Sequence, residues 1–179
     1  MDANNSSRRA FAAAAGAAAV GLTTGAARSA PDDILGISGS NSAIHQEVVF
    51  AAGPERVYQV LTDARLFDKV VLLGGAVASM ALTATPAQIS AEAGGAFSIF
   101  GGYINGRHIE LTPGVRVVQA WRAGSWAPHI YSIVRFELVP NSGGTRLLFD
   151  QTGFPNAEAT SLATGWQEHY WAPMAKVLA

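Results

Sequence analysis

The chain ends on GWQEHYWAPMAKVLA, residues 165–179, and this stretch decides how the fold is interpreted. Apolar side chains recur through it at helical spacing, at Trp166, Tyr170, Pro173 and Val177, with polar residues mostly on the other side. Pro173 cannot donate a backbone hydrogen bond, so the helix is expected to bend in its last turns. A bent aromatic helix at the end of a chain suggests a cover over a hollow surface.

Six strand-length segments precede this helix. They are residues 87–92, 96–101, 103–111, 115–123, 130–139 and 144–151. Turn residues separate them, among them Gly94-Gly95, Pro113-Gly114 and the run Asn141-Ser142-Gly143-Gly144. Strands joined in chain order by short turns predict an antiparallel meander.

Alternation along each segment predicts which side chains face inward, because successive side chains in a strand point to opposite faces. In VRVVQAWRA, residues 115–123, the arginines belong outside, so the inward set is Val115, Val117, Gln119 and Trp121. In YSIVRFELV, residues 131–139, the same rule turns inward Val134, Phe136 and Leu138. In residues 103–111 it places Ile109 and Leu111 inside together with Asn105 and Arg107, which leaves His108 and Glu110 on the solvent face.

These faces predict a small-molecule site between sheet and helix. The candidate ligand-binding residues are Arg107, Gln119, Trp121 and Phe136 on the sheet with Trp166 and Tyr170 on the helix. An apolar lining with a few convergent polar groups is the usual composition of such a site. The alternative is a filled core, in which Arg107 extends past its aliphatic stem to solvent and Gln119 bonds to backbone.

The first half of the folded region is simpler. IHQEVVF, residues 44–50, predicts a strand, and residues 54–64 predict a helix that Pro54 begins. Residues 70–86 are apolar without a clean period, which leaves either a short helix and loop or a mobile flap. The order strand, helix, six strands, long helix predicts an α+β fold, in which a curved antiparallel sheet of six to seven strands wraps around the C-terminal helix.

The N-terminal thirty residues have the order of an export signal. The twin arginines Arg8-Arg9 precede an Ala/Gly-rich apolar run, and small residues end at Ala30. Ser7 to Phe11 resembles the twin-arginine motif, although Ala12 and Ala13 stand where Leu and Lys often follow. We therefore expect a twin-arginine-type signal at residues 1–30, a linker at residues 31–43 and a periplasmic or secreted domain at residues 44–179, with no membrane association after cleavage.

Composition excludes several classes of function. A net charge of −1 with no basic run beyond Arg8-Arg9 gives no electrostatic footprint for nucleic acid. The absence of cysteine removes thiolate nucleophiles and thiolate metal sites. The four histidines, His45, His108, His129 and His169, have no metal-ligand spacing, and no nucleophile elbow is present. The sequence predicts no metal, no cofactor and no catalytic residue.

Several motifs carry a resemblance to a known family. These are GGAFSIFGGYINGRHIELTPGVRVVQAWR (94–122), YSIVRFEL (131–138), GGTRLLFDQTGFP (143–155) and GWQEHYWAPM (165–174). They resemble bacterial domains similar to the activator of the heat-shock-protein-90 ATPase, within the START-type or SRPBCC helix-grip superfamily, over residues 44–179. The chain departs most from the family pattern at residues 70–86. A Trp commonly follows the first helix in the family, and Val70 and Val71 stand there in this chain.

The resemblance implies a helix-grip fold with a hydrophobic cavity, and it leaves three functions open. The first is an exported protein that binds an apolar or amphipathic small molecule. The second is a cyclase- or hydrolase-type enzyme, with Arg107 stabilising an oxyanion. The third is a co-chaperone-like module whose protein partner the sequence does not identify. An exported domain would not meet a partner that stays in the cytosol.

Overall fold

The computed structural model describes residues 43–179. The predicted export signal, residues 1–30, and the predicted linker up to Ser42 lie outside the described residues and stay predictions. The first strand begins at Ala43, one residue earlier than expected.

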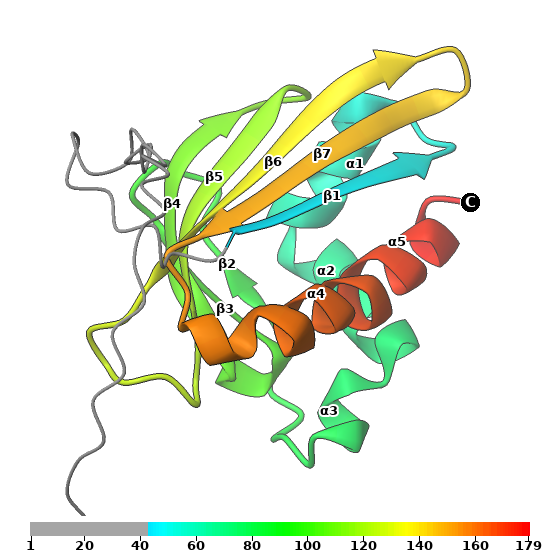
Figure 1. Cartoon of the computed structure of the whole chain (residues 1–179). Helices are drawn as coiled ribbons and strands as arrows, with labels where there is room; N and C mark the ends of the chain where they lie inside the picture. Colours follow the sequence, from blue (N-terminus) through cyan, green and yellow to red (C-terminus); the bar gives the residue numbers. More distant parts are fainter. Residues whose placement is uncertain (1–42) are drawn as a thin grey trace, which may run out of the picture. The chain divides into compact units, whose positions relative to one another are not determined.

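Within the described residues the strands form a single antiparallel sheet (Figure 1). Its strands are β1 (Ala43–Phe50), β2 (Gln88–Ile89), β3 (Ala96–Ile99), β4 (Ile104–Thr112), β5 (Arg116–Ala123), β6 (Ser132–Asn141) and β7 (Gly144–Thr152). The order across the sheet is β1-β7-β6-β5-β4-β3-β2, so β2 to β7 form the predicted meander and β1 pairs with the last strand. The predicted α+β helix-grip architecture is confirmed.

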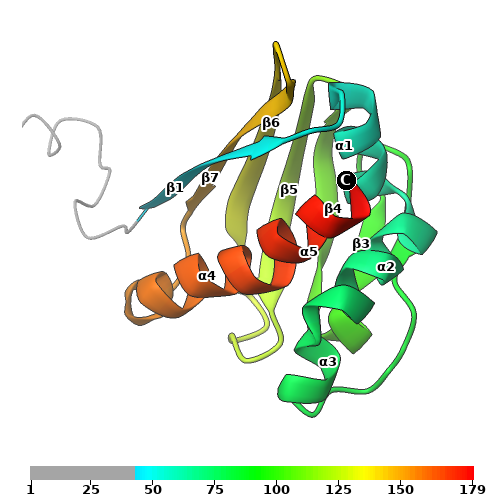
Figure 2. The same ribbon diagram turned by 90° about the vertical axis from the view of Figure 1, so that its right-hand side faces the viewer.

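The helices lie on one face of the curved sheet (Figure 2). They are α1 (Pro54–Thr62), α2 (Ala64–Gly74), α3 (Ala76–Ser79), α4 (Ala159–Trp166) and α5 (Ala172–Val177), with short 3-10 turns at Phe100–Gly102 and Asn156–Glu158. Pro54 stands at the start of α1 as expected. Asp63 caps α2, its carboxylate accepting from the Leu66 backbone N–H at 2.9 Å. Residues 70–86 adopt the helix-and-loop alternative, because α2 continues to Gly74 and α3 follows it.

The C-terminal helix departs from regular α geometry just before its proline. Residues Gln167–Trp171 form a π-helical turn, in which the Ala172 N–H donates to the Gln167 carbonyl five residues earlier. A proline removes one backbone donor and crowds the preceding turn, and a π-helical turn is one of the ways a helix accommodates a local irregularity. The helix is therefore irregular just before Pro173, where a widened turn joins α4 to α5, and the bend expected in its last turns stays a prediction.

Strands β5 and β6 present the predicted faces to the helix. Val117, Gln119 and Trp121 on β5 are buried, and so are Val134, Phe136 and Leu138 on β6. The prediction for Val115 is wrong. This residue precedes β5 in the turn after Thr112, where alternation does not apply, and its side chain is about half exposed.

Strand β4 contradicts the predicted inward face over part of its length. The β4–β5 register shifts between His108 and Glu110, so one extra residue is inserted at Ile109. Ile109 is 52% exposed and His108 only 1%, while Arg107 lies on the solvent side. Counting the alternation back from Leu111 assigns the wrong face to the residues before the bulge, because the extra residue exchanges the two faces of the strand. The inward orientation predicted for Arg107 and the surface position predicted for His108 are both wrong.

Between the sheet and the C-terminal helix the centre of the molecule is filled by aromatic rings. The Trp166 ring centroid lies 4.3 Å from that of Phe149 and 4.1 Å from that of Tyr170. Phe136 and Trp171 complete this cluster, with centroids 6.2 Å apart. Any space for a guest molecule must therefore lie at the margin of the helix–sheet interface.

Candidate functional site

A pocket of about 210 Å³ opens beside this aromatic cluster, between α4 with the π-helical turn and the region where β4 begins and β5 ends. Its lining residues are mostly apolar or aromatic: Met80, Phe100, Tyr103, Ile104, Trp121, Ala123, Glu158, Ser161, Leu162, Gly165, Trp166, His169 and Tyr170. The resemblance implies a hydrophobic cavity between the sheet and the C-terminal helix. The pocket lies at one end of this space, and the aromatic cluster fills its centre.

One wall of the pocket is held in an unusual backbone conformation. Phe100 has a φ of +51°, and Gly101 and Gly102 follow with φ values of +65° and +90°. A bulky residue in the left-handed region is strained and persists only where its surroundings enforce it. The Phe100 ring packs against Phe67 and Tyr170, with centroids 5.6 Å and 5.2 Å away. The left-handed turn therefore places an aromatic ring in the pocket wall.

Tyr170 lines the pocket, and its hydroxyl group lies beside Trp121, another residue of the lining. The Trp121 Nε1–H donates to its oxygen at 3.5 Å. Burial raises the pKa of the Tyr170 phenol well above its usual range, so the group keeps its proton at neutral pH. No group in residues 43–179 accepts that proton.

Within the described residues, the remaining polar lining comes from Tyr103, whose hydroxyl donates to Ser125 Oγ, and from three residues of the C-terminal segment. Ser161 donates to the backbone carbonyl and the carboxylate of Glu158, at 2.9 Å and 3.2 Å. His169 Nδ1 is buried and has no hydrogen-bond partner in the described part of the chain. Ser161 and His169 lie eight residues apart on the helix, which separates them by roughly 12 Å along its axis. They are therefore too far apart to act as a nucleophile and its base.

The predicted site residues divide into three groups. Trp121, Trp166 and Tyr170 line the pocket. Phe136 belongs to the filled aromatic cluster, and Gln119 is buried on β5, where its Nε2 lies 3.5 Å from His108 Nδ1. Arg107 faces solvent and donates to the Gly94 carbonyl at 2.9 Å. An oxyanion-stabilising role for Arg107 has no support from this position.

The sequence analysis missed several pocket residues, including Phe100, Leu162 and Gly165. Gly165 carried a usable signal, because a glycine inside a helix costs about 1 kcal/mol relative to alanine. In the structure a Cβ at this position would have no atom within 4 Å. A glycine that leaves open space on the inner side of a covering helix indicates a hollow.

His108 is a buried titratable group on β4 that does not belong to the pocket lining. Its ring packs against Phe97 at 5.4 Å between centroids, and its Nε2 has no partner within residues 43–179. Burial lowers the pKa of His108 from its ordinary value of 6.5. The neutral imidazole is therefore the form that the fold accommodates.

We expect His108 to make folding pH-dependent. The pKa of His108 is lower in the folded state than in the unfolded state. Its contribution to the free energy of unfolding is therefore fully present above pH 6.5 and is lost as the pH falls below that value. The slope it contributes reaches at most about 1.4 kcal/mol per pH unit. His108→Phe should flatten the free energy of unfolding between pH 6.5 and 5.5, measured by urea denaturation. An unchanged slope in this variant would contradict the assignment.

His45 provides a control of opposite sign. A hydrogen bond to Asp150 raises the pKa of His45, so its contribution is present below pH 6.5 and lost as the pH rises through its folded-state pKa. His45→Gln removes this contribution, so the free energy of unfolding should fall toward low pH at least as steeply as in the wild type. His108→Phe should instead make that fall shallower.

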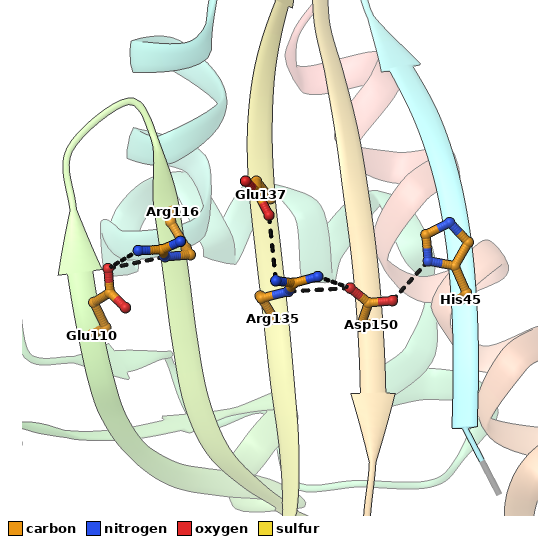
Figure 3. A network of polar contacts seen from close by, with 6 residues as sticks. All are labelled: His45, Glu110, Arg116, Arg135, Glu137 and Asp150. Carbon is orange, nitrogen blue, oxygen red and sulfur yellow. Dashed lines mark hydrogen bonds and ion pairs between the residues drawn. The ribbon is translucent and has the colours of Figure 1, made fainter.

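His45 belongs to an ionic network on the outer face of the sheet (Figure 3). Its Nδ1 lies 2.7 Å from Asp150, which also accepts from Arg135 at 2.7 Å. Arg135 lies 3.5 Å from Glu137, and a separate pair joins Glu110 to Arg116 at 2.8 Å. The network links β1, β7 and β6. Its members are largely exposed, so it contributes little to stability.

A second surface feature surrounds the end of α2. Leu72 and Leu73 are 80% and 51% exposed, and they share a shallow hollow with the three basic residues Arg56, Lys69 and Lys176. A further apolar hollow of about 580 Å³ lies between α2, α3 and residues 81–86. Exposed apolar patches of this kind mark interaction surfaces.

Among residues 43–179, no three His, Asp or Glu side chains come together in a way that would hold a metal ion. Along the same residues, no helix combines the length and the apolar character needed to cross a membrane.

Several known proteins are similar to this chain in sequence. The family model of Activator of Hsp90 ATPase homolog 1-like protein matches residues 51–179. Activator of 90 kDa heat shock protein ATPase homolog 2 of Mus musculus is 28% identical over 137 residues, which cover 76% of this chain and 38% of that protein. Homolog 1 of Homo sapiens is 26% identical, with 76% and 37% covered. The chain thus spans less than two fifths of the length of these relatives.

Solved structures share the fold. An HSP90 activator from Plasmodium falciparum superposes with a TM-score of 0.61 at 23% identity, covering 77% of this chain and 95% of the other. A protein from Chromobacterium violaceum has a TM-score of 0.59 at 26% identity, covering 76% and 96%.

Proposed function

The chain belongs to the family of Activator of Hsp90 ATPase homolog 1-like proteins, and from this premise we propose that its helix-grip domain binds an apolar or amphipathic small molecule. The observation that carries the proposal is the pocket of about 210 Å³, whose lining is mostly apolar or aromatic with a few polar groups. Such a composition is typical of small-molecule sites.

The filled centre limits the size of the guest. Ligand pockets usually measure about 300–1,000 Å³, and this one is smaller. Trp166 and Tyr170 occupy the space through which the pocket would otherwise extend toward Phe136. The proposed guest is therefore a compact molecule of one or two rings rather than a long-chain lipid.

Titration with 2-acetylnaphthalene tests the proposal. We expect one-to-one binding with a micromolar dissociation constant by isothermal titration calorimetry. Nuclear Overhauser contacts should join the probe to Trp121, Leu162 and Tyr170, because all three line the pocket. Absence of binding up to the solubility limit, or contacts confined to the outer face of the sheet, would contradict it.

A protein-docking role is the second candidate, and the exposed leucines beside Arg56, Lys69 and Lys176 favour it. The curated relatives are named as activators of the 90 kDa heat shock protein ATPase, and this chain spans less than two fifths of their length. Stimulation of a purified Hsp90 ATPase by the domain would support this role. An unchanged ATPase rate at saturating domain would count against it.

We also propose export through the twin-arginine route, which the sequence of residues 1–30 supports. Fractionation of cells expressing a C-terminally tagged chain distinguishes the two settings. A periplasmic or secreted product fits an exported binding protein. A wholly cytoplasmic product would contradict export and leave the protein-docking role accessible.

A further inference from the structure

Among the described residues that line the pocket, one hydroxyl proton and one ring nitrogen lack hydrogen-bond partners, and both belong to the π-helical turn. The Tyr170 side chain is only 6% exposed, yet no group in the described residues accepts its hydroxyl proton. His169 Nδ1 is equally without a partner among residues 43–179. Buried polar groups are paired in the great majority of cases, so each of these atoms requires an explanation. Both residues line the pocket, and a guest molecule would supply the missing partner.

The charge of the lining narrows the class of guest. Among residues 43–179, Glu158 is the one acidic residue of the lining, and neither lysine nor arginine contributes to it. An anionic guest would lose its hydration without gaining the permanent countercharge of a lysine or arginine and would be repelled by the Glu158 carboxylate. The lining therefore disfavours carboxylates and phosphates.

Resting on the proposed small-molecule function, we propose that the pocket selects an uncharged guest with a hydrogen-bond acceptor, such as a ketone oxygen, which the Tyr170 hydroxyl binds. The Trp121 N–H occupies one lone pair of the Tyr170 oxygen and leaves the hydroxyl proton for the guest. Because burial opposes ionisation of the phenol, Tyr170 acts only as a neutral donor.

Three naphthalene probes of matched size test this assignment by calorimetry. They are 2-acetylnaphthalene, which is neutral and has an acceptor, 2-ethylnaphthalene, which has no acceptor, and 2-naphthoate, which is an anion. The ethyl compound is the more hydrophobic, so apolar burial alone would make it bind most tightly. We expect the ketone to bind about five- to tenfold more tightly than the ethyl compound, the effect of one buried hydrogen bond, and the naphthoate to bind most weakly.

Substitution of Tyr170 and of a tyrosine outside the pocket assigns the effect to one hydroxyl. Tyr170→Phe should abolish the preference for the ketone while retaining affinity for 2-ethylnaphthalene. Tyr131→Phe is the matched control, because Tyr131 is about half exposed and lies outside the pocket lining. This control should leave the preference unchanged.

The outcomes separate the two proposals. If none of the probes binds the wild-type chain, small-molecule binding in this pocket is itself contradicted. If the probes bind but the ketone shows no preference in the wild type, or keeps its preference in Tyr170→Phe, the assignment of guest class is overturned and the pocket function stands. The wild-type comparison requires no variant, so it decides the question even if Tyr170→Phe folds poorly after losing the partner of Trp121.

Discussion

Replacing Trp166 with alanine is expected to lower the free energy of unfolding by about 3–5 kcal/mol. Trp166 is buried and its ring contacts five others, those of Trp121, Phe136, Phe149, Tyr170 and Trp171. Its Nε1–H also donates to Gln151 at 2.7 Å, and Gln151 in turn donates to Ser132 at 2.9 Å. The substitution removes the ring and leaves a buried amide oxygen without its donor.

Urea denaturation followed by circular dichroism measures this loss. Tyr131→Ala is the control, since Tyr131 is an aromatic residue that is about half exposed, and its replacement should change stability by no more than about 0.5 kcal/mol. A loss below about 1 kcal/mol for Trp166→Ala would show that the ring cluster does not hold the helix on the sheet.

The order of elements could be predicted because its signals are local. Turn residues such as Pro113-Gly114 bound the strands, and alternation in β6 separates Arg135 and Glu137 from the buried side chains. The bulge at Ile109 has no comparable local signal. It is a property of the pairing between β4 and β5, and it exchanged the predicted positions of Arg107 and His108.

The candidate site could be predicted in part for the same reason. Aromatic residues at strand and helix spacing identified Trp121, Trp166 and Tyr170, which line the pocket. Whether the space between sheet and helix is hollow or filled depends on how side-chain volumes fit together, which no local pattern reports. Both alternatives hold in different places, because the centre is filled and one end is open. The position of Phe100 depends on a positive φ that a phenylalanine does not favour.

Gly165→Leu is expected to weaken guest binding by at least about tenfold while the fold remains intact. Gly165 lines the pocket, and a side chain there would extend into open space. Four added carbon atoms would occupy volume that the guest needs, in a pocket of only about 210 Å³. Leucine is also the better helix former, so stability should be maintained or raised by up to about 1 kcal/mol. Loss of binding would then not result from unfolding.

Thr164→Leu is the matched control, because Thr164 is the preceding residue of α4 and its side chain is exposed. It adds an apolar side chain to the same helix outside the pocket lining. Its affinity for 2-acetylnaphthalene should equal that of the wild type.

The most direct measurement is calorimetric titration of 2-acetylnaphthalene into the wild-type chain, Gly165→Leu and Thr164→Leu under identical conditions. The account predicts binding to the wild type and to Thr164→Leu and its loss in Gly165→Leu, with all three proteins equally folded. Equal affinity in all three would contradict it, since the guest would then bind somewhere other than the pocket beneath α4.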